Sequence, residues 1–195
     1  MTRRIVLASS SRYRQEQLSR LGLPFVTDAP AIDESPRPGE AARATAERLS
    51  LAKAQAVAAR HADAIVIGAD QVAELDGRPV GKPGTHEAAL AQLLAMQGRT
   101  VRFHSGVAVA DSSDGRSESA CVDTDVRFRR LDAGALEAYL RADRPYDCAG
   151  SAKIESLGIC LVEAVHSDDP TALVGLPLIA LTTLLARLGV ALPLR

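Results

Sequence analysis

The chain has no tryptophan, three phenylalanines, three tyrosines and only three cysteines among its 195 residues. So few aromatic rings, together with a net charge of −1, argue against a nucleic-acid-binding protein, which needs a basic surface and rings for stacking. Cys121, Cys148 and Cys160 lie far apart, so neither a zinc site nor a disulfide framework is indicated. A reducing cytoplasm is therefore the expected location.

Long apolar runs are also missing. Residues 171–186 carry no charge, but Pro177 interrupts this stretch and Arg187 ends it, short of the roughly 20 residues that a bilayer requires. We expect a buried helix that begins at Pro177, because proline is tolerated in the first turn. Arg3 and Arg4 precede only a short apolar run, too few residues for a signal-peptide core. Neither a membrane span nor a secretory signal is expected.

The residues that are present favour a soluble protein of the α/β class. Hydrophobic residues make up 47% of the chain and charged residues 24%, which is ordinary for a globular protein. Apolar runs alternate with helical patterns. We expect strands at 5–8, 23–26, 64–70, 79–80, 100–110, 119–128 and 159–165, and helices at 12–21, 40–61, from 85, at 132–141 and from 177. No repeat or shift of composition marks a domain boundary within 1–195.

Three polar features accompany these predicted elements. Asp70 ends the apolar run 64–70, which indicates a buried strand that stops at a carboxylate. Lys82 lies between Gly81 and Pro83. Residues 9–11 are all serine and join the first strand to a basic helix, where backbone N–H groups can bind an anion. This combination suits an enzyme that acts on a metal-bound phosphate ester.

Five acidic or basic side chains are candidates for that chemistry. Glu34, Asp70 and Glu155 could hold a hard divalent cation or orient water, while Lys53 and Lys82 could neutralise phosphate oxygens. Each has an ordinary alternative. Asp70 could be a surface strand end, Lys82 a loop charge, and Lys53 a core-packed stem with its head in solvent. Sequence spacing alone leaves these alternatives open.

Several familiar catalytic motifs are excluded. Residues 77–83 resemble a P-loop, but one residue is missing between the glycines, and Pro83 replaces the metal-binding serine or threonine. No G-x-S-x-G, H-E-x-x-H or G-x-G-x-x-G motif occurs, and the four histidines are scattered. Hydrolysis through a histidine-activated serine is therefore unsupported.

Short motifs follow one another along almost the whole chain and together resemble one family. They are Ser9-x-Ser11-x-x-Arg14, Asp33-Glu34, Ala52-Lys53-Ala54, Gly68-Ala69-Asp70-Gln71, Gly81-Lys82-Pro83, His104-Ser105-Gly106, Cys148-Ala149-Gly150-Ser151-x-Lys153-x-Glu155 and Asp169-Pro170-x-x-Leu173-Val174-Gly175. This set resembles the Maf nucleotide pyrophosphatases, and its C-terminal part is similar to the branch acting on 7-methyl-GTP, the YceF-like subfamily. Arg12 stands where the family often has proline, a position that we expect to cap the turn.

The resemblance implies a fold of the inosine-triphosphatase type: a long bent mixed β-sheet flanked by helices, in a single domain 1–195 with two lobes around a central cleft. It implies hydrolysis of 7-methyl-GTP to 7-methyl-GMP and diphosphate, which removes a modified nucleotide, with Mg²⁺ or Mn²⁺ as cofactor. Two alternatives stay open, a dTTP/UTP pyrophosphatase of the same family and a non-catalytic nucleotide-binding regulator. The oligomeric state is open, and a homodimer is compatible with the sequence.

The resemblance also implies roles for individual residues. Asp70 would accept the proton of the attacking water and, with Glu34, bind the metal. The triphosphate would be held by Ser9, Ser11, Arg14, Lys53 and Lys82.

Three further residues are expected to select the base. Methylation at N7 makes guanine cationic, so an aromatic face such as Tyr13 and a nearby acid would favour it. Glu155 can accept from guanine N1–H and the exocyclic amine, and Gln71 can add an amide hydrogen bond. The alternative is that Tyr13 only packs on its own helix and that Glu155 is solvated.

Overall fold

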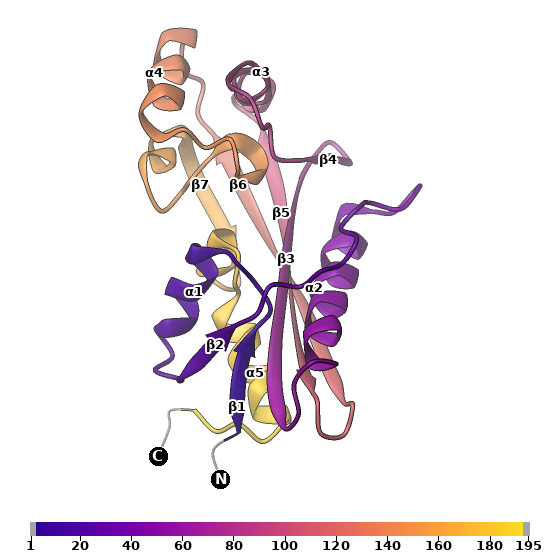
Figure 1. Ribbon diagram of the computed structural model, residues 1–195. Helices are drawn as coiled ribbons and strands as arrows, with labels where there is room; N and C mark the ends of the chain where they lie inside the picture. Colours follow the sequence, from indigo (N-terminus) through magenta and orange to yellow (C-terminus); the bar gives the residue numbers. More distant parts are fainter. Residues whose placement is uncertain (1–2, 193–195) are drawn as a thin grey trace.

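One mixed β-sheet runs through the computed structural model, which describes residues 3–192 (Figure 1). The strand order is β2-β1-β3-β5-β6-β7, with β4 beside β3. The strands are β1 Arg4–Leu7, β2 Phe25–Thr27, β3 Ala64–Leu75, β4 Arg78–Val80, β5 Thr100–Asp111, β6 Ser117–Phe128 and β7 Val162–Ser167. The helices are α1 Arg12–Ser19, α2 Ala42–Ala58, α3 His86–Met96, α4 Ala133–Asp143 and α5 Leu178–Arg187, with short 3₁₀ helices η1 Ala149–Ser151, η2 Leu157–Leu161 and η3 Ala172–Val174. The predicted α/β class is confirmed.

Strand β3 organises the sheet because it has different partners along its length. Its first residues, Ala64–Ile67, pair in parallel with β1, and its last residues, Ala73–Leu75, pair with β4. Strand β5 pairs antiparallel with β3 from Ile65 to Glu74. Residues 68–72 therefore have a strand neighbour on one side only within the described chain. The sheet is open at this point, and the chain leaving β1 turns into α1 beside the opening.

The expectation that the β3 strand stops at Asp70 was wrong. Asp70 lies in the middle of β3, because β5 continues to supply hydrogen-bonding partners as far as Glu74. Successive side chains of a strand point to opposite faces. Asp70 therefore faces α2, while Gln71 faces the opposite side, where η3 lies.

Helices cover both faces of the sheet around this strand. Ile5, Leu7, Ile65 and Ile67 pack with the leucines of α5 on one face, while the alternate residues Val6, Ala8, Ala64 and Val66 pack with Val57 of α2 on the other. A second core cluster lies between the sheet and helices α3 and α4 (Figure 1). The sheet extends through both clusters, and the expected division into one domain with two lobes stays a prediction.

Local hydrogen bonding explains where the helices begin. The Thr85 hydroxyl accepts from Ala88 N and caps α3, as its position predicted. The helix expected to begin at Pro177 begins one residue later, at Leu178, and Pro177 is its N-cap. No helix within residues 3–192 combines the length and apolar character needed to cross a bilayer.

The strand expected at 159–165 begins later than predicted. Residues 157–161 form η2, and strand β7 starts at Val162. Gly158 packs directly on the backbone of Lys153, where a Cβ would lie 2.6 Å from the Lys153 nitrogen. This close approach holds the chain in a tight turn, so the apolar run cannot be extended throughout.

We expect Gly68→Ala to destabilise the protein by about 1–3 kcal/mol, the usual cost of overpacking a core. A Cβ at Gly68 would collide with the Ser50 carbonyl oxygen of α2 and lie 2.6 Å from the Ala54 nitrogen. Chemical denaturation measures the free energy of unfolding. Gly81→Ala is the control, because a Cβ there meets no atom of the described residues within 4 Å. Equal stability of the two variants would show that α2 can move away from the sheet.

Candidate active site

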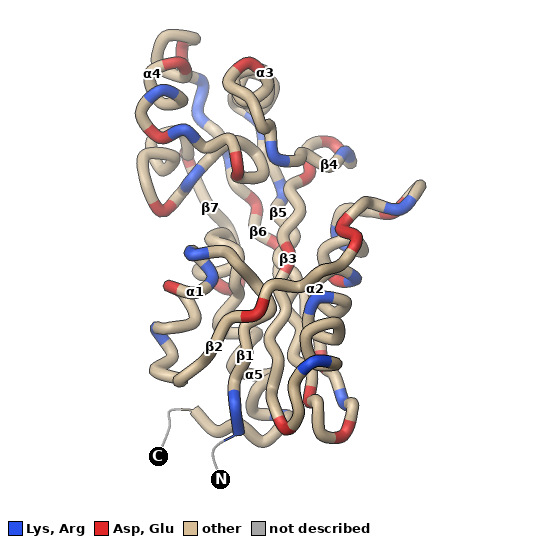
Figure 2. Tube along the Cα trace, viewed as in Figure 1, with Lys and Arg blue, Asp and Glu red and all other residues tan. Residues whose placement is uncertain are grey.

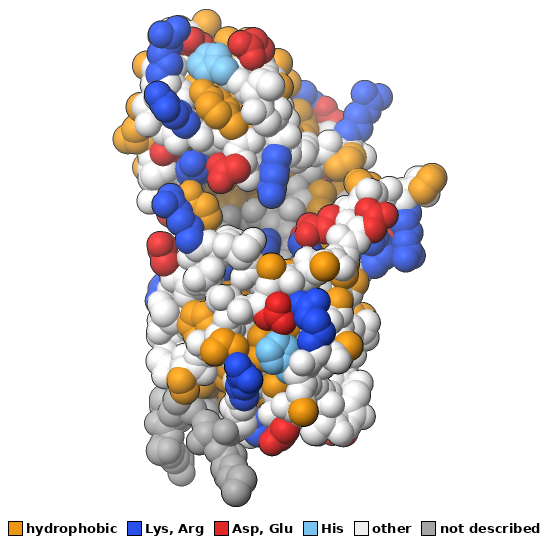
Figure 3. Space-filling view, in the orientation of Figure 1, with side chains coloured by type: hydrophobic (Ala, Val, Ile, Leu, Met, Phe, Trp, Pro, Cys, Tyr) orange, Lys and Arg blue, Asp and Glu red, His pale blue; other side chains and the backbone are white. Residues whose placement is uncertain are grey.

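A cavity of about 570 Å³ opens where β3 lacks its second neighbour. Figure 3 shows the surface hollowed at this level, with charged side chains around the rim. Nine of the ten predicted site residues line the cavity: Ser9, Ser11, Tyr13, Arg14, Glu34, Lys53, Gln71, Lys82 and Glu155. The tenth, Asp70, is not among the lining residues, but its carboxylate is bonded to the lining residue Lys53.

The turn between β1 and α1 brings the serines to the cavity. The Ser11 hydroxyl accepts from Arg14 N at 3.5 Å and caps α1, and the Ser9 hydroxyl accepts from Ser11 N at 3.1 Å. Ser11 therefore has a structural role as the N-cap of α1. The hydroxyls still line the cavity beside the N-terminus of α1, where an anion is favoured.

Lys53 joins two carboxylates at the back of the cavity. Its Nζ donates to Glu34 Oε2 at 2.6 Å and to Asp70 Oδ1 at 2.7 Å. Figure 2 traces the loop that carries Glu34 across the front of β3 and α2. The side chains of Lys53 and Asp70 are 6% and 11% exposed, whereas Glu34 is 53% exposed. The alternative that placed the Lys53 head in solvent was therefore wrong.

Burial raises the pKa of Asp70 above that of an ordinary aspartate. The charges of Lys53 and Arg14 act in the opposite direction but do not cancel this effect. A carboxylate with a raised pKa, held at a cavity, binds a proton more readily than one in water. This property is useful in a general base.

Arg14 adds a positive charge on the other side of the cavity. Its Nε donates to the Gly175 carbonyl at 2.9 Å, which anchors α1 to the segment before α5. Burial lowers the pKa of this guanidinium, and the charges of Asp70 and Glu34 oppose that shift. An arginine remains protonated in proteins. Together with exposed Lys82, it surrounds the cavity with cations.

Three lining residues were expected to contact the base. The ring of Tyr13 carries the Arg12 guanidinium at 4.8 Å from its centroid, so its face already holds a cation. Gln71 is bonded through its amide nitrogen to Ser105 and to two carbonyls of η3. Glu155 is exposed at the cavity, so both its binding role and its solvated alternative remain open.

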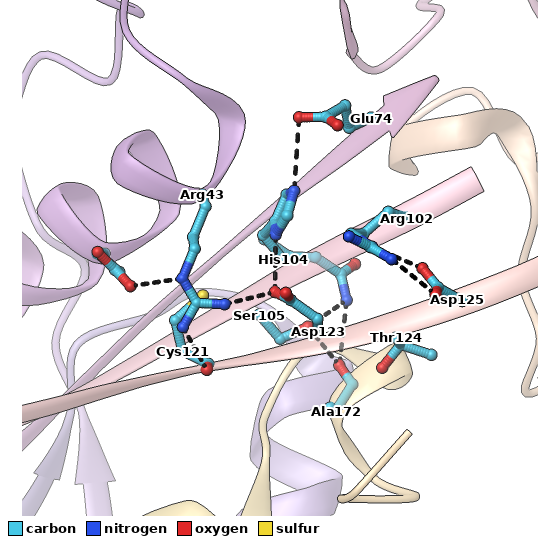
Figure 4. Close-up of polar contacts among 12 residues, drawn as sticks. Arg43, Glu74, Arg102, His104, Ser105, Cys121, Asp123, Thr124, Asp125 and Ala172 are labelled. Atoms are coloured by element: carbon cyan, nitrogen blue, oxygen red, sulfur yellow. Dashed lines mark hydrogen bonds and ion pairs between the residues drawn. The ribbon is translucent and has the colours of Figure 1, made fainter. Parts of the chain in front are cut away.

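Two features of the site were missed in the sequence. Arg12 was expected only to cap the turn, yet it lines the cavity and contacts Tyr13. Ser105 belongs to the motif His104-Ser105-Gly106, which contributes to the family resemblance but predicts no role for the serine. The motif's histidine is buried between Asp123 and Glu74 on the α2 face of the sheet (Figure 4). Cys148 also lines the cavity, but burial raises the pKa of its thiol to about 12, which disfavours the nucleophilic thiolate at neutral pH.

A mixed α/β fold with a buried lysine–carboxylate cluster behind a cation-lined cavity is typical of enzymes that act on nucleotide phosphates. The chain matches the family described as Maf-like protein over residues 4–188, and it belongs to that family.

Several bacterial relatives resemble the chain over nearly its whole length. A 7-methyl-GTP pyrophosphatase of Bordetella pertussis is 58% identical over 186 residues, which cover 95% of this chain and 92% of the relative. Proteins of the same name from Cupriavidus metallidurans and Burkholderia thailandensis are 57% and 59% identical. The alignments cover 95% of this chain in both cases, and 93% and 88% of the relatives, respectively.

Proposed function

We propose that this protein is a nucleoside triphosphate pyrophosphatase that hydrolyses 7-methyl-GTP to 7-methyl-GMP and diphosphate, and so removes a modified nucleotide. The observation that carries the proposal is the contact of Lys53 with both Asp70 and Glu34 at the back of the cavity. The names of the similar bacterial proteins support the choice of substrate. A cytoplasmic location and a homodimer stay predictions.

In the proposed reaction, Asp70 accepts a proton from the water that attacks the α-phosphorus. The water oxygen bonds to the α-phosphorus and stays on the nucleoside monophosphate. The bond between the α-phosphorus and the bridging oxygen breaks, and diphosphate leaves with the bonding electron pair. Negative charge accumulates on the oxygens during this step. Arg14, Lys53 and Lys82 are the cations that can offset it.

Glu34 and Asp70 are the residues that would hold a divalent metal. Among residues 3–192, no three His, Cys, Asp or Glu side chains form a metal-binding group by themselves. Two carboxylates nevertheless fit Mg²⁺ or Mn²⁺, because Mg²⁺ at nucleotides is bound through one or two carboxylates, water and the substrate phosphates. The metal would supply additional neutralisation of the phosphate charge when bound.

The cavity also fits a cationic base. The contact of the Arg12 guanidinium with the Tyr13 ring supports this proposal, because a 7-methylguanine ring could take the place of the guanidinium. Glu155 adds a negative charge to the same cavity. A neutral pyrimidine lacks the positive charge that would favour its contact with Tyr13 and Glu155.

A panel of triphosphates tests the proposal directly. 7-methyl-GTP, GTP, dTTP and UTP are each supplied with Mg²⁺ or Mn²⁺, and diphosphate and monophosphate are quantified. We expect the highest kcat/KM for 7-methyl-GTP, with both products in equal amounts and no turnover without metal. Preferred hydrolysis of dTTP and UTP would support the first alternative. Nucleotide binding without diphosphate release would support the regulator.

Glu155→Gln should lower the preference for 7-methyl-GTP over GTP by about 10- to 100-fold, because the carboxylate charge attracts the cationic 7-methylguanine ring but not the neutral guanine ring. The amide keeps the shape of the side chain but removes its negative charge. The ratio of the two kcat/KM values measures the effect. Glu163→Gln is the control, because Glu163 lies on β7 and pairs with Arg127. An unchanged ratio in Glu155→Gln would leave this residue without a role in base selection.

A further inference from the structure

The Gln71 amide is held on the face of β3 opposite Asp70. Its Nε2 lies 3.0 Å from Ser105 Oγ, 3.1 Å from the Ala172 carbonyl and 3.1 Å from the Leu173 carbonyl. Ser105 is fully buried on β5, in register with Gln71, and its hydroxyl donates to the same Ala172 carbonyl at 2.8 Å (Figure 4). A nitrogen with two hydrogens is thus surrounded by three acceptors.

These neighbours fix which end of the amide faces the cavity. If the amide rotated by half a turn, its oxygen would lie against the carbonyls of Ala172 and Leu173, which cannot donate a hydrogen bond. Ser105 could donate to that oxygen only by giving up its bond to Ala172. The observed orientation is therefore strongly favoured. No donor within residues 3–192 bonds to Gln71 Oε1, although Gln71 lines the cavity.

We propose that Ser105 is a positioning residue: with the two carbonyls of η3, it fixes the Gln71 amide so that only the amide oxygen is offered to the nucleobase. This position then accepts hydrogen bonds and donates none. With the Glu155 carboxylate, the cavity presents two acceptors, which match the N1–H and exocyclic amine of a guanine. The inference rests on the proposed function, because it assigns the base edge read at that site.

Ser105→Ala tests the positioning role through selectivity. We compare kcat/KM for 7-methyl-GTP with that for the triphosphate of 7-methylinosine, which lacks the exocyclic amine. The wild-type preference should fall by about 3- to 10-fold in Ser105→Ala, the effect of one neutral hydrogen bond. Ser50→Ala is the matched control, because Ser50 is equally buried and, within residues 3–192, its hydroxyl bonds only to the Glu47 carbonyl of its own helix. An equal preference in both variants would overturn the inference.

A second measurement needs no substrate. The side-chain amide protons of Gln71, identified by their loss from the NMR spectrum of Gln71→Met, should exchange slowly with solvent in the wild type and several-fold faster in Ser105→Ala. Equal exchange rates would overturn the positioning role even if selectivity changed. If the wild type releases no diphosphate from 7-methyl-GTP, the proposed function fails, and the exchange rates alone decide the role of Ser105.

Discussion

Asp70→Asn should reduce kcat by about 10²- to 10⁴-fold, the usual contribution of a general base. Asparagine has nearly the same shape as aspartate but accepts no proton from water at neutral pH. Glu34 remains bonded to Lys53, so the ammonium keeps one of its two partners. The variant loses the ion pair between Lys53 and Asp70, which destabilises the protein, but it also removes a buried charge, which stabilises it. We expect these two effects to offset each other, with little change in Tm.

The pH dependence of the wild type gives an independent readout of the same group. Because burial raises the pKa of Asp70, the acid limb of kcat/KM should lie above pH ~4, where an ordinary aspartate titrates. The limb should disappear in the residual activity of Asp70→Asn. Asp125→Asn is the control, since that strand carboxylate pairs with Arg102 at 2.7 Å outside the cavity. Normal turnover of a folded Asp70→Asn would remove Asp70 from the proposed mechanism.

Lys53→Met should affect both activity and stability. The methionine removes the ammonium that separates Glu34 from the buried Asp70. We expect kcat to fall by about 10²- to 10³-fold, because transition-state charge loses a preorganised cation. At neutral pH the free energy of unfolding should fall by about 3 kcal/mol, since breaking a buried ion pair leaves an uncompensated charge.

The stability loss in Lys53→Met should depend on pH. The pKa of Asp70 is higher in the folded protein than in the unfolded chain, so ionised Asp70 destabilises the folded protein. This destabilisation is absent below the unfolded-state pKa and is complete once the pH has risen through the folded-state pKa. Lys53 lowers this pKa, so its removal enlarges the cost. Urea denaturation at several pH values should show that the difference from wild type shrinks toward acid pH.

Two controls separate this effect from a general loss of packing. Lys53→Met combined with Asp70→Asn should recover most of the lost stability, because the buried charge is then absent. Lys82→Met should raise KM without changing the pH dependence of stability, since Lys82 is exposed and has no ion pair within the described chain. A stability loss in Lys53→Met that is equal at every pH would contradict the electrostatic explanation.

Some features of the molecule follow from short stretches of sequence. The cap at Thr85 and the start of α5 after Pro177 depend on backbone conformation and on hydrogen bonds between near neighbours. Continuous apolar runs on β1 and β3 indicated buried strands, because both faces of these strands are covered. The ordered motifs were sufficient to indicate the family and the ten candidate site residues, although their roles stay predictions.

Other features exist only because distant segments meet. The sequence places a polar pair, Asp70 and Gln71, after an apolar run, which is typical of a strand end. Pairing with β5 instead keeps β3 extended and sends the two side chains to opposite faces. Lys53 became a buried partner of Asp70, and Ser105 a partner of Gln71, only through tertiary packing. Local propensity determined the elements, whereas the burial and hydrogen bonding of these charges and amides depend on neighbours that are remote in the chain.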